Sequence, residues 1–416
     1  DRDARSAPTF TKNRVFIQES KTCHVEVAHS GHHAQTLGIV RVVIIAESFL
    51  PRVNGVSGSV IRTSRHLLSQ GHHVEIIAPS PSPRETPDGV RVHSVRSFSV
   101  PGMGIDVGYA CTSTIRDILR HVRPDVVHLA SPLVLGYQAL RAATMECIPT
   151  VAVFQTDISG FARHYRLTGL GGLSDAVLRR IHAEADLTLV PSTASREYLQ
   201  TLGVRRLAIW GRGVDADQFD PRRRSPELRT RWLRSQPDRV LVGYVGRLAP
   251  EKRVAALRAF RKDPRVRLVI IGDGPQRVEL EKVLTGAHFT GMLRGSDLGT
   301  AMASLDILVA PGERETFCQV VQEGMASGLP VVAPDIGGPR DLVVHGEVGL
   351  RYPPGDDEGL RECVDALVQS QAARRVMGAT ARRAVRDRTW TQLGDELIQH
   401  YRCLTTTEGT ARHSAA

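Results

Sequence analysis

The 416-residue chain has few aromatic residues, few cysteines and no long apolar run. Its six cysteines are scattered, and no two of them form the Cys-x-x-Cys spacing of a zinc or redox site. A disulfide framework is therefore not expected, and a reducing, cytoplasmic compartment fits the composition. No apolar run reaches the roughly 18 residues that a membrane-spanning helix needs. The length and a hydrophobic content of 41% predict two or three globular domains.

Lysine is scarce too, although the chain is basic overall. The net charge is +10, yet only five of the 54 basic residues are lysines. Such a charge suits phosphorylated substrates or an anionic membrane surface as partners. Aromatic residues make up only 5% and do not interleave with a dense basic run, so nucleic acid is not an expected partner. In this context Lys252, in a loop after a predicted strand, is a candidate functional residue.

Patterns of metal ligands are weak. The 16 histidines include no His-x-x-x-His pair on a convincing helix. Asp215 and Asp217 form an Asp-x-Asp pair, but they follow Gly213 in a segment where Asp commonly forms turns. We therefore expect neither a metal nor another cofactor.

The two ends of the chain differ from its middle. Residues 1–39 mix polar, charged and histidine residues without a sustained period, which predicts a disordered extension. This extension does not resemble a signal peptide, because no apolar stretch follows its charged start. We expect ordered structure from Val40 on and a disordered tail over residues 405–416.

Between these ends, short apolar runs alternate with amphipathic segments. Residues 41–46 and 73–78 are predicted strands, and residues 58–70 between them form a predicted helix. Such a βαβ unit requires a parallel sheet. The loop at 51–56 contains Gly55, whose backbone N–H can approach a phosphate, although a tight turn after a strand also needs glycine.

A second series of strands and helices begins at Val240, and its first helix is predicted after Lys252, to about Arg261. It follows residues 221–226, a segment rich in proline and arginine that we interpret as an interdomain linker. We expect two consecutive doubly wound α/β domains. The first spans residues 40–218, with a helix at 390–404 returning to it, and the second spans residues 219–389.

Residues 312–328 carry the strongest functional pattern. Glu315 and Glu323 are separated by seven residues and follow a predicted strand at 307–310. A helix predicted over 317–327 places Glu315 in the loop before it and Glu323 about two turns inside it. Ligands bind at the carboxyl ends of parallel strands, and a carboxylate can accept hydrogen bonds from two neighbouring hydroxyls, so the pattern indicates a sugar site. Two solvated charges on a surface helix are the alternative.

Two more loops follow strands of the second domain. Arg247 and Lys252 can clamp a diphosphate, with the guanidinium acting as a fork and the ammonium as a point charge. Gly272 and Gly274 lie in a Gly-Asp-Gly-Pro sequence that opens a predicted helix. These glycines allow a tight turn from strand to helix, lie close to a nucleotide, or do both.

Together these motifs resemble the retaining glycosyltransferases of family 4. The resemblance rests on Gly-Arg at 246–247 with Glu-Lys at 251–252, Gly-Asp-Gly-Pro at 272–275, Glu-x7-Glu at 315–323 with the Ala-Ser-Gly-Leu-Pro that follows it, and Phe-Gln-Thr-Asp at 154–157. It implies the GT-B fold, in which two facing Rossmann-like domains hold the active site in the cleft between them. The sequence around Gln155 and Glu315 is most similar to GDP-mannose-dependent α-mannosyltransferases.

The resemblance implies a site for the donor diphosphate. Arg247 and Lys252 would bind the diphosphate, and Gly55 would approach it from the facing domain. Gly272 and Gly274 would lie near the nucleotide.

The resemblance also implies how the two sugars of the donor are held. Glu315 would accept hydrogen bonds from the hydroxyls of the transferred sugar, aided by the backbone N–H groups of Phe317, Cys318 and Gln319. Glu323 would bind the ribose diol.

Two positions depart from the family pattern. Gln155 stands where many relatives have histidine, and an amide cannot take up a proton, so a general base at that position is excluded. Asp157 is the nearest polar candidate for a catalytic contact. Cys318 stands where glycine often follows the phenylalanine, and its side chain narrows the approach to the sugar.

The implied reaction transfers mannose from GDP-mannose to a glycolipid or polyprenyl-linked acceptor, with retention and without a metal. The alternatives are a UDP-sugar-dependent glycolipid glycosyltransferase, a nucleotide-sugar-binding protein without transfer activity, and a GT-B epimerase, whose acidic and histidine groups we do not find. Arg62, Arg65 and His66 beside apolar residues of the early helix also suggest peripheral contact with the inner face of the cell membrane. An ordinary amphipathic core helix with a basic outer face is the alternative.

Overall fold

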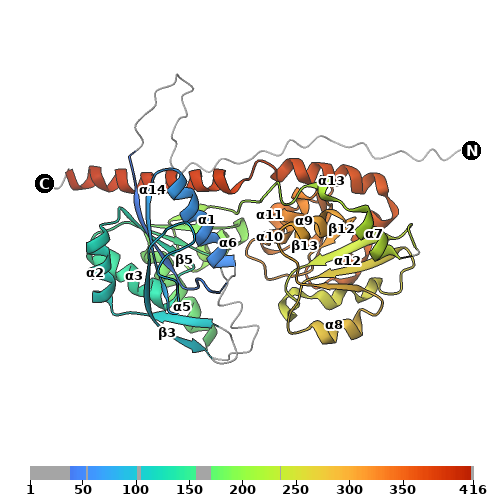
Figure 1. The fold of residues 1–416 in the computed structure, drawn as a ribbon, viewed down its shortest axis with the longest axis horizontal. Coiled ribbons are helices and arrows are strands. Elements are labelled where there is room, and N and C mark those ends of the chain that lie inside the picture. Colours follow the sequence, from blue (N-terminus) through green and yellow to red (C-terminus); the bar gives the residue numbers. More distant parts are fainter. Residues whose placement is uncertain (1–37, 53–54, 101–104, 156–169, 235, 414–416) are drawn as a thin grey trace, which may run out of the picture. The chain divides into compact units, whose positions relative to one another are not determined.

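Two sheets organise the protein, one in each half of the chain (Figure 1). The computed structural model describes residues 38–52, 55–100, 105–155, 170–234 and 236–413. Both sheets belong to one compact unit that begins at Ile39. We refer to the part with the first sheet as the N-terminal half and to the part with the second sheet as the C-terminal half.

The first sheet has eight strands in the order β4-β3-β2-β1-β5-β6-β7-β8. All neighbouring strands are parallel except β3 and β4, which form an antiparallel pair at one edge. The strands are β1 (Arg41–Ala46), β2 (His73–Pro79), β3 (Val92–Val100), β4 (Ile105–Tyr109), β5 (Val126–Ala130), β6 (Thr150–Val153), β7 (Leu187–Val190) and β8 (Leu207–Ile209). The helices that connect them are α1 (Gly55–Ser69), α2 (Thr112–Val122), α3 (Val134–Met145), α5 (Leu170–Glu184) and α6 (Thr193–Thr201).

The central strand β1 shows why the sequence folds in this way. Its side chains alternate between the two faces of the sheet. Val42 and Ile44 enter one apolar core, whereas Val43 and Ile45 enter another on the opposite face. Both faces are therefore covered, which explains a nearly continuous apolar run in place of alternating polar and apolar residues.

The second sheet has six strands, all parallel, in the order β11-β10-β9-β12-β13-β14. These are β9 (Val240–Val245), β10 (Val266–Ile271), β11 (His288–Gly291), β12 (Ile307–Val309), β13 (Val331–Pro334) and β14 (Gly349–Tyr352). The helices around it are α7 (Pro226–Leu233), α8 (Arg277–Val283), α9 (Gly295–Ala303), α10 (Gln319–Ala326), α11 (Gly337–Leu342), α12 (Asp357–Gln369) and α13 (Gln371–Val385). Since the strands are parallel, their carboxyl ends meet at one edge, and the loops that follow β9, β10 and β12 lie together there.

Two segments differ from the sequence prediction. The helix expected after Lys252 is replaced by two short 3-10 helices, η2 (Pro250–Lys252) and η3 (Val254–Phe260). Arg253 between them has φ 51°, a left-handed conformation that an α-helix cannot continue through. The expected linker at 221–226 is also structured, because it forms η1 (Pro221–Arg223) and the start of α7.

The last helix, α14 (Trp390–His413), packs against α1 and completes the core of the N-terminal half (Figure 1). Its Leu393, Leu397, Ile398 and Tyr401 join the core cluster of the first sheet. The Tyr401 hydroxyl lies 2.7 Å from Nδ1 of the buried His128 on β5. The core of the N-terminal half is therefore built from both ends of the described chain.

The ends of the chain are described only in part. The disordered extension expected over residues 1–39 falls, except for its last two residues, outside the described residues. At the other end α14 continues to His413, through the segment where we expected a disordered tail. The Thr405 hydroxyl bonds back to the Arg402 carbonyl at 3.1 Å, a local bond that a threonine makes within a helix.

Candidate active site

A cavity of about 560 Å³ lies at the carboxyl ends of the strands. The C-terminal half lines it with the loops after β9 and β12, and the N-terminal half contributes Gly55 and Gln155. Seven of the predicted site residues line this cavity: Gly55, Gln155, Arg247, Lys252, Glu315, Cys318 and Gln319. The parallel topology brings them together from positions more than 250 residues apart in the chain.

An ion pair between Lys252 and Glu315 occupies the wall of this cavity. The Lys252 ammonium donates to Oε1 of Glu315 at 2.5 Å, and the two side chains are 28% and 17% exposed. Burial lowers the pKa of the Lys252 ammonium, but the charge and hydrogen bond of the Glu315 carboxylate raise it by more. The pKa of Lys252 therefore lies above its usual value. The cavity thus holds a cation and an anion side by side, next to the exposed Arg247.

Cys318 begins helix α10 in a left-handed conformation, with φ 69°. A residue other than glycine costs about 1 kcal/mol or more in this region. Its thiol is buried beside Glu315, and burial raises the pKa of the thiol well above its usual value. Phe317, just before Cys318, is buried and does not line the cavity. Its backbone packs closely on Gly338, because a Cβ on Gly338 would lie 2.3 Å from the Phe317 Cα.

Gly272 and Gly274 lie beneath the loop that carries Arg247. A Cβ on Gly272 would lie 1.9 Å from the Gly246 carbonyl oxygen, and one on Gly274 would lie 2.4 Å from the Leu248 carbonyl oxygen. Gly272 also has φ 140°, which only glycine adopts easily. Neither glycine lines the cavity, so packing beneath this loop accounts for both.

Glu323 lies on α10, outside the cavity lining, and faces basic residues of the N-terminal half. Burial raises the pKa of its carboxyl to about 7, against the opposing effects of Arg62, a hydrogen bond from Gln319, and Arg212. The two glutamates of the Glu-x7-Glu pattern therefore have different surroundings. Glu315 has a lysine partner at hydrogen-bond distance, whereas burial raises the pKa of Glu323 and two arginines oppose that shift.

Gln155 is anchored at both its backbone and its side chain. The Thr316 hydroxyl donates to the Gln155 carbonyl at 3.1 Å, and the Arg212 Nη2 donates to its Oε1 at 3.0 Å. Oε1 is engaged in this way, and the amide also carries two Nε2 hydrogens that can donate. Asp157, the other polar candidate of this region, lies outside the described residues.

Two charged residues of this region were not predicted from the sequence. Arg212 lies in the segment between β8 and η1. Glu47 follows β1, and its Oε1 accepts backbone hydrogen bonds from Leu133 at 2.6 Å and Gly136 at 2.7 Å, at the start of α3. Burial raises the pKa of Glu47 to about 7. For Glu47 the sequence offered one signal, its position directly after the buried strand β1. For Arg212 it offered none of this kind, because β8 is only partly buried and ends three residues earlier.

The basic face of α1 makes contacts within the protein. Arg65 forms an ion pair with Asp88 at 2.9 Å, and His66 lies 2.9 Å from Asp395 of α14. Leu67 is buried. The membrane contact predicted for this face stays a prediction. No helix in the described part of the chain is both long and apolar enough to cross a membrane.

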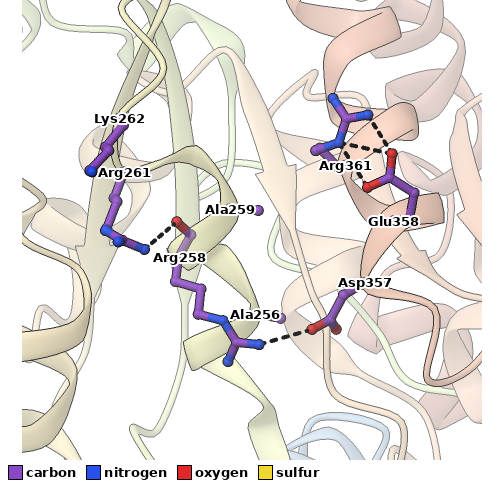
Figure 2. Close-up of a pocket in the computed structure, with 8 residues that line it drawn as sticks. All are labelled: Ala256, Arg258, Ala259, Arg261, Lys262, Asp357, Glu358 and Arg361. Carbon is purple, nitrogen blue, oxygen red and sulfur yellow. Dashed lines mark hydrogen bonds and ion pairs between the residues drawn. The ribbon is translucent and has the colours of Figure 1, made fainter.

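A second hollow, of about 510 Å³, lies between η3 and α12 (Figure 2). Figure 2 shows that much of its charge is engaged locally, since Arg258 points to Asp357 and Arg361 binds Glu358 on its own helix. None of the predicted site residues lines it. Among the residues that the structure describes, no three His, Cys, Asp or Glu side chains are grouped as metal ligands would be.

The fold matches solved glycosyltransferase structures of the GT-B type. HepE from Anabaena, solved with UDP, superposes with a TM-score of 0.72 at 17% identity and covers 88% of this chain and 100% of that one. Sucrose-phosphate synthase from Thermosynechococcus elongatus gives the same score at 19% identity, with the same coverage of both chains. At these identities the likeness shows the fold alone, which is that of a two-domain GT-B protein.

The sequence then gives the family. Residues 53–218 match the family described as Glycosyltransferase Family 4, and residues 229–384 match Glycosyl transferases group 1. A GDP-mannose-dependent alpha-mannosyltransferase from Mycolicibacterium smegmatis is 49% identical over 87% of this chain and 97% of its own. The Mycobacterium tuberculosis protein of the same name is 47% identical over 87% and 96%. A sulfoquinovosyl transferase from Arabidopsis thaliana is 35% identical over 81% of this chain and 68% of its own. The chain belongs to glycosyltransferase family 4, which confirms the resemblance drawn from its motifs.

Proposed function

We propose that the protein is a retaining α-mannosyltransferase that moves mannose from GDP-mannose to a glycolipid or polyprenyl-linked acceptor. The observation that carries this proposal is identity of 40% to 49%, over most of both chains, with three GDP-mannose-dependent alpha-mannosyltransferases. The motif residues that distinguish such an enzyme from a binding protein, Arg247, Lys252, Glu315 and Glu323, are all present.

In this proposal the cavity holds the donor by its reacting end. Arg247 and Lys252 bind the diphosphate, and Glu315 binds hydroxyls of the mannose. As the sugar–phosphate bond breaks, negative charge grows on the diphosphate, and the two cations stabilise it in a setting that is already organised. Glu323 and the start of α10 hold the ribose and the sugar in place.

The acceptor proton needs a base, and Gln155 cannot supply one. A phosphate oxygen of the leaving diphosphate takes the acceptor proton in the front-face path that the family resemblance implies. No metal takes part in this scheme. The acceptor approaches from the N-terminal half, close to the membrane surface from which a glycolipid is presented.

The test compares donors and follows both products. The purified protein is incubated with GDP-mannose or UDP-glucose and a total glycolipid extract; nucleotide release and new glycolipids are measured by mass spectrometry. We expect GDP release and a glycolipid heavier by one hexose only with GDP-mannose. Turnover with the UDP-sugar alone would favour the alternative that the 35% identity to the sulfoquinovosyl transferase keeps open. Donor binding without release of nucleotide would leave a binding protein.

A further inference from the structure

The hollow between η3 and α12 is lined mainly by charged side chains (Figure 2). It is separate from the candidate active site, because the two cavities share no lining residue. Its charged lining consists of four basic residues, Arg258, Arg261, Lys262 and Arg361, and two acidic residues, Asp357 and Glu358. Basic side chains therefore outnumber acidic ones in this hollow.

Both acidic residues of the lining already bind arginines. Asp357 accepts a hydrogen bond from Arg253 at 2.9 Å and also lies 3.5 Å from the Arg258 guanidinium. Glu358 accepts a hydrogen bond at 2.9 Å from Arg361, which follows it by three residues on α12. These two carboxylates thus serve three guanidinium groups, and neither of them pairs with the other two cations of the lining.

Arg261 and Lys262, which directly follow η3, are those two cations. Arg261 donates to the Arg258 carbonyl at 3.5 Å, a contact at the limit of hydrogen-bond distance. No side chain in the described part of the protein pairs with the Lys262 ammonium, and in Figure 2 no dashed line reaches it. Asp263, the next residue, binds Arg265 through both of its oxygens. The hollow therefore contains two neighbouring cations whose charge no carboxylate among the described residues balances.

We propose that this hollow binds a phosphate group, with Arg261 and Lys262 as its main contacts. A guanidinium presents a planar fork of donors to phosphate oxygens, and an ammonium adds a compact positive charge beside it. Arg258 can supply a third cation, because its pairing with Asp357 is loose at 3.5 Å and its side chain is 56% exposed. The volume of about 510 Å³ lies within the range of small-molecule sites, roughly 300–1,000 Å³.

Two sources offer such a phosphate. One is a small phosphorylated molecule that enters the hollow, and the other is the headgroup of a membrane lipid. The cations make the same contacts with the phosphate oxygens in both cases. Neither source depends on mannose transfer, so this site stands or falls independently of the proposed function.

The three lysines of the described chain allow a test that resolves the sites. Lys252 lines the candidate active site, Lys262 lines the hollow, and the exposed Lys282 of α8 lines neither. The protein is treated with an amine-acetylating reagent at increasing concentrations of inorganic pyrophosphate, and the labelling rate of each lysine is measured by peptide mass spectrometry. Because Lys252 is followed separately, binding of pyrophosphate in the candidate active site is not mistaken for binding in the hollow.

Bound phosphate should shield Lys262 from the reagent. At about ten times the dissociation constant about one tenth of the sites stay free, so we expect the labelling of Lys262 to slow by about tenfold. The labelling of Lys282 should stay within about twofold, because no site for phosphate surrounds it. Sodium chloride at the same ionic strength should not protect Lys262 selectively, since screening by salt acts on both exposed lysines alike.

Arg261→Gln removes one cation of the proposed site. We expect it to raise the pyrophosphate concentration that gives half protection of Lys262 by about fivefold, the effect of one accessible charge pair. Arg383→Gln is the matched control, because Arg383 is also exposed and also donates to a residue three positions earlier, Thr380. This control should change the half-protecting concentration by less than about twofold.

Vesicles separate the two sources of phosphate. Protection of Lys262 by pyrophosphate assigns the site to a small phosphorylated molecule. Protection by vesicles of phosphatidylcholine and phosphatidylglycerol in equal amounts, without protection by pyrophosphate, assigns it to a lipid headgroup. The proposal is overturned if neither probe slows the labelling of Lys262, if Lys262 and Lys282 slow equally, or if Arg261→Gln leaves the protection unchanged.

Discussion

Replacing Glu315 by glutamine should separate donor affinity from catalysis, because Glu315 and Lys252 bind each other in the wall of the cavity. Lys252 has to share or leave this carboxylate when a diphosphate arrives. The pair is partly buried, at 17% and 28% exposure, so we place its strength at the upper end for accessible pairs, about 1 kcal/mol. Glu315→Gln removes both that competition and a negative charge beside the diphosphate. GDP should therefore bind about fivefold more tightly.

The same substitution should slow the reaction. The transferred sugar gains positive charge as its bond to phosphate breaks, and a neutral amide stabilises that charge less than a carboxylate does. We expect kcat to fall by roughly ten- to thousandfold, equivalent to about 1.4–4 kcal/mol. Glu315→Gln should therefore bind GDP more tightly and turn over more slowly. A simple loss of folding cannot produce this combination, because it would weaken both binding and turnover.

The assay combines calorimetry with GDP and steady-state kinetics with GDP-mannose, with folding checked by circular dichroism. Glu313→Gln is the matched control: Glu313 lies two residues away, pairs with Arg253 and does not line the cavity. Lys252→Met should weaken GDP binding. If Glu315→Gln binds GDP more weakly than the parent protein, or keeps its kcat, the pairing of these two residues does not control the donor site and our reasoning is wrong.

Three other changes test the remaining parts of the site. Glu323→Ala should raise the KM for the donor on the order of tenfold with kcat nearly unchanged in steady-state kinetics, because a ribose contact is alike in ground and transition states. Burial raises the pKa of Glu47 from 4.5 to about 7 in the folded protein, so the protonated carboxyl favours the folded state at low pH. As pH rises from about 4.5 through about 7, the free energy of unfolding should fall by at most about 3 kcal/mol. Glu47→Gln should not show this fall when urea denaturation is measured between pH 5 and 8. Gly272→Ala should destabilise by roughly 2–4 kcal/mol in urea unfolding because of its overlap with Gly246, whereas Gly71→Ala, with φ 78° and nothing within 4 Å, should cost only about 1 kcal/mol.

The sequence predicted the parts of the site that follow local rules. Arg247, Lys252 and Glu315 lie in loops after buried strands, and a parallel sheet brings the ends of such strands to one edge. The apolar runs of β1 and β9 were recognisable because both faces of each sheet are covered. Spacing within short segments was sufficient for these predictions, since each depends on a single strand and the loop after it.

Other features depend on contacts that no spacing reveals. Arg212 lies in an irregular segment, and its importance appears only when β8 places it beside Gln155 and α1. Arg253 interrupts the predicted helix through its left-handed backbone, a conformation that its residue type does not favour. For Gly272 and Gly274 the sequence left a tight turn and a position near the nucleotide both open, and only the structure shows the backbone atoms of the adjacent loop packed against them.

The return of α14 to the first sheet sets an order for folding during synthesis. Domains of a nascent chain generally fold from the N-terminus onward. Here the Trp210 indole donates to the Leu393 carbonyl at 2.9 Å, and His128 forms a hydrogen bond with the Tyr401 hydroxyl. Core residues that are synthesised early therefore have partners that are synthesised last. A ribosome-bound chain that ends before α14 holds an N-terminal half whose core is open along the face that this helix covers. The core of the first half is therefore completed only after the second half has been synthesised.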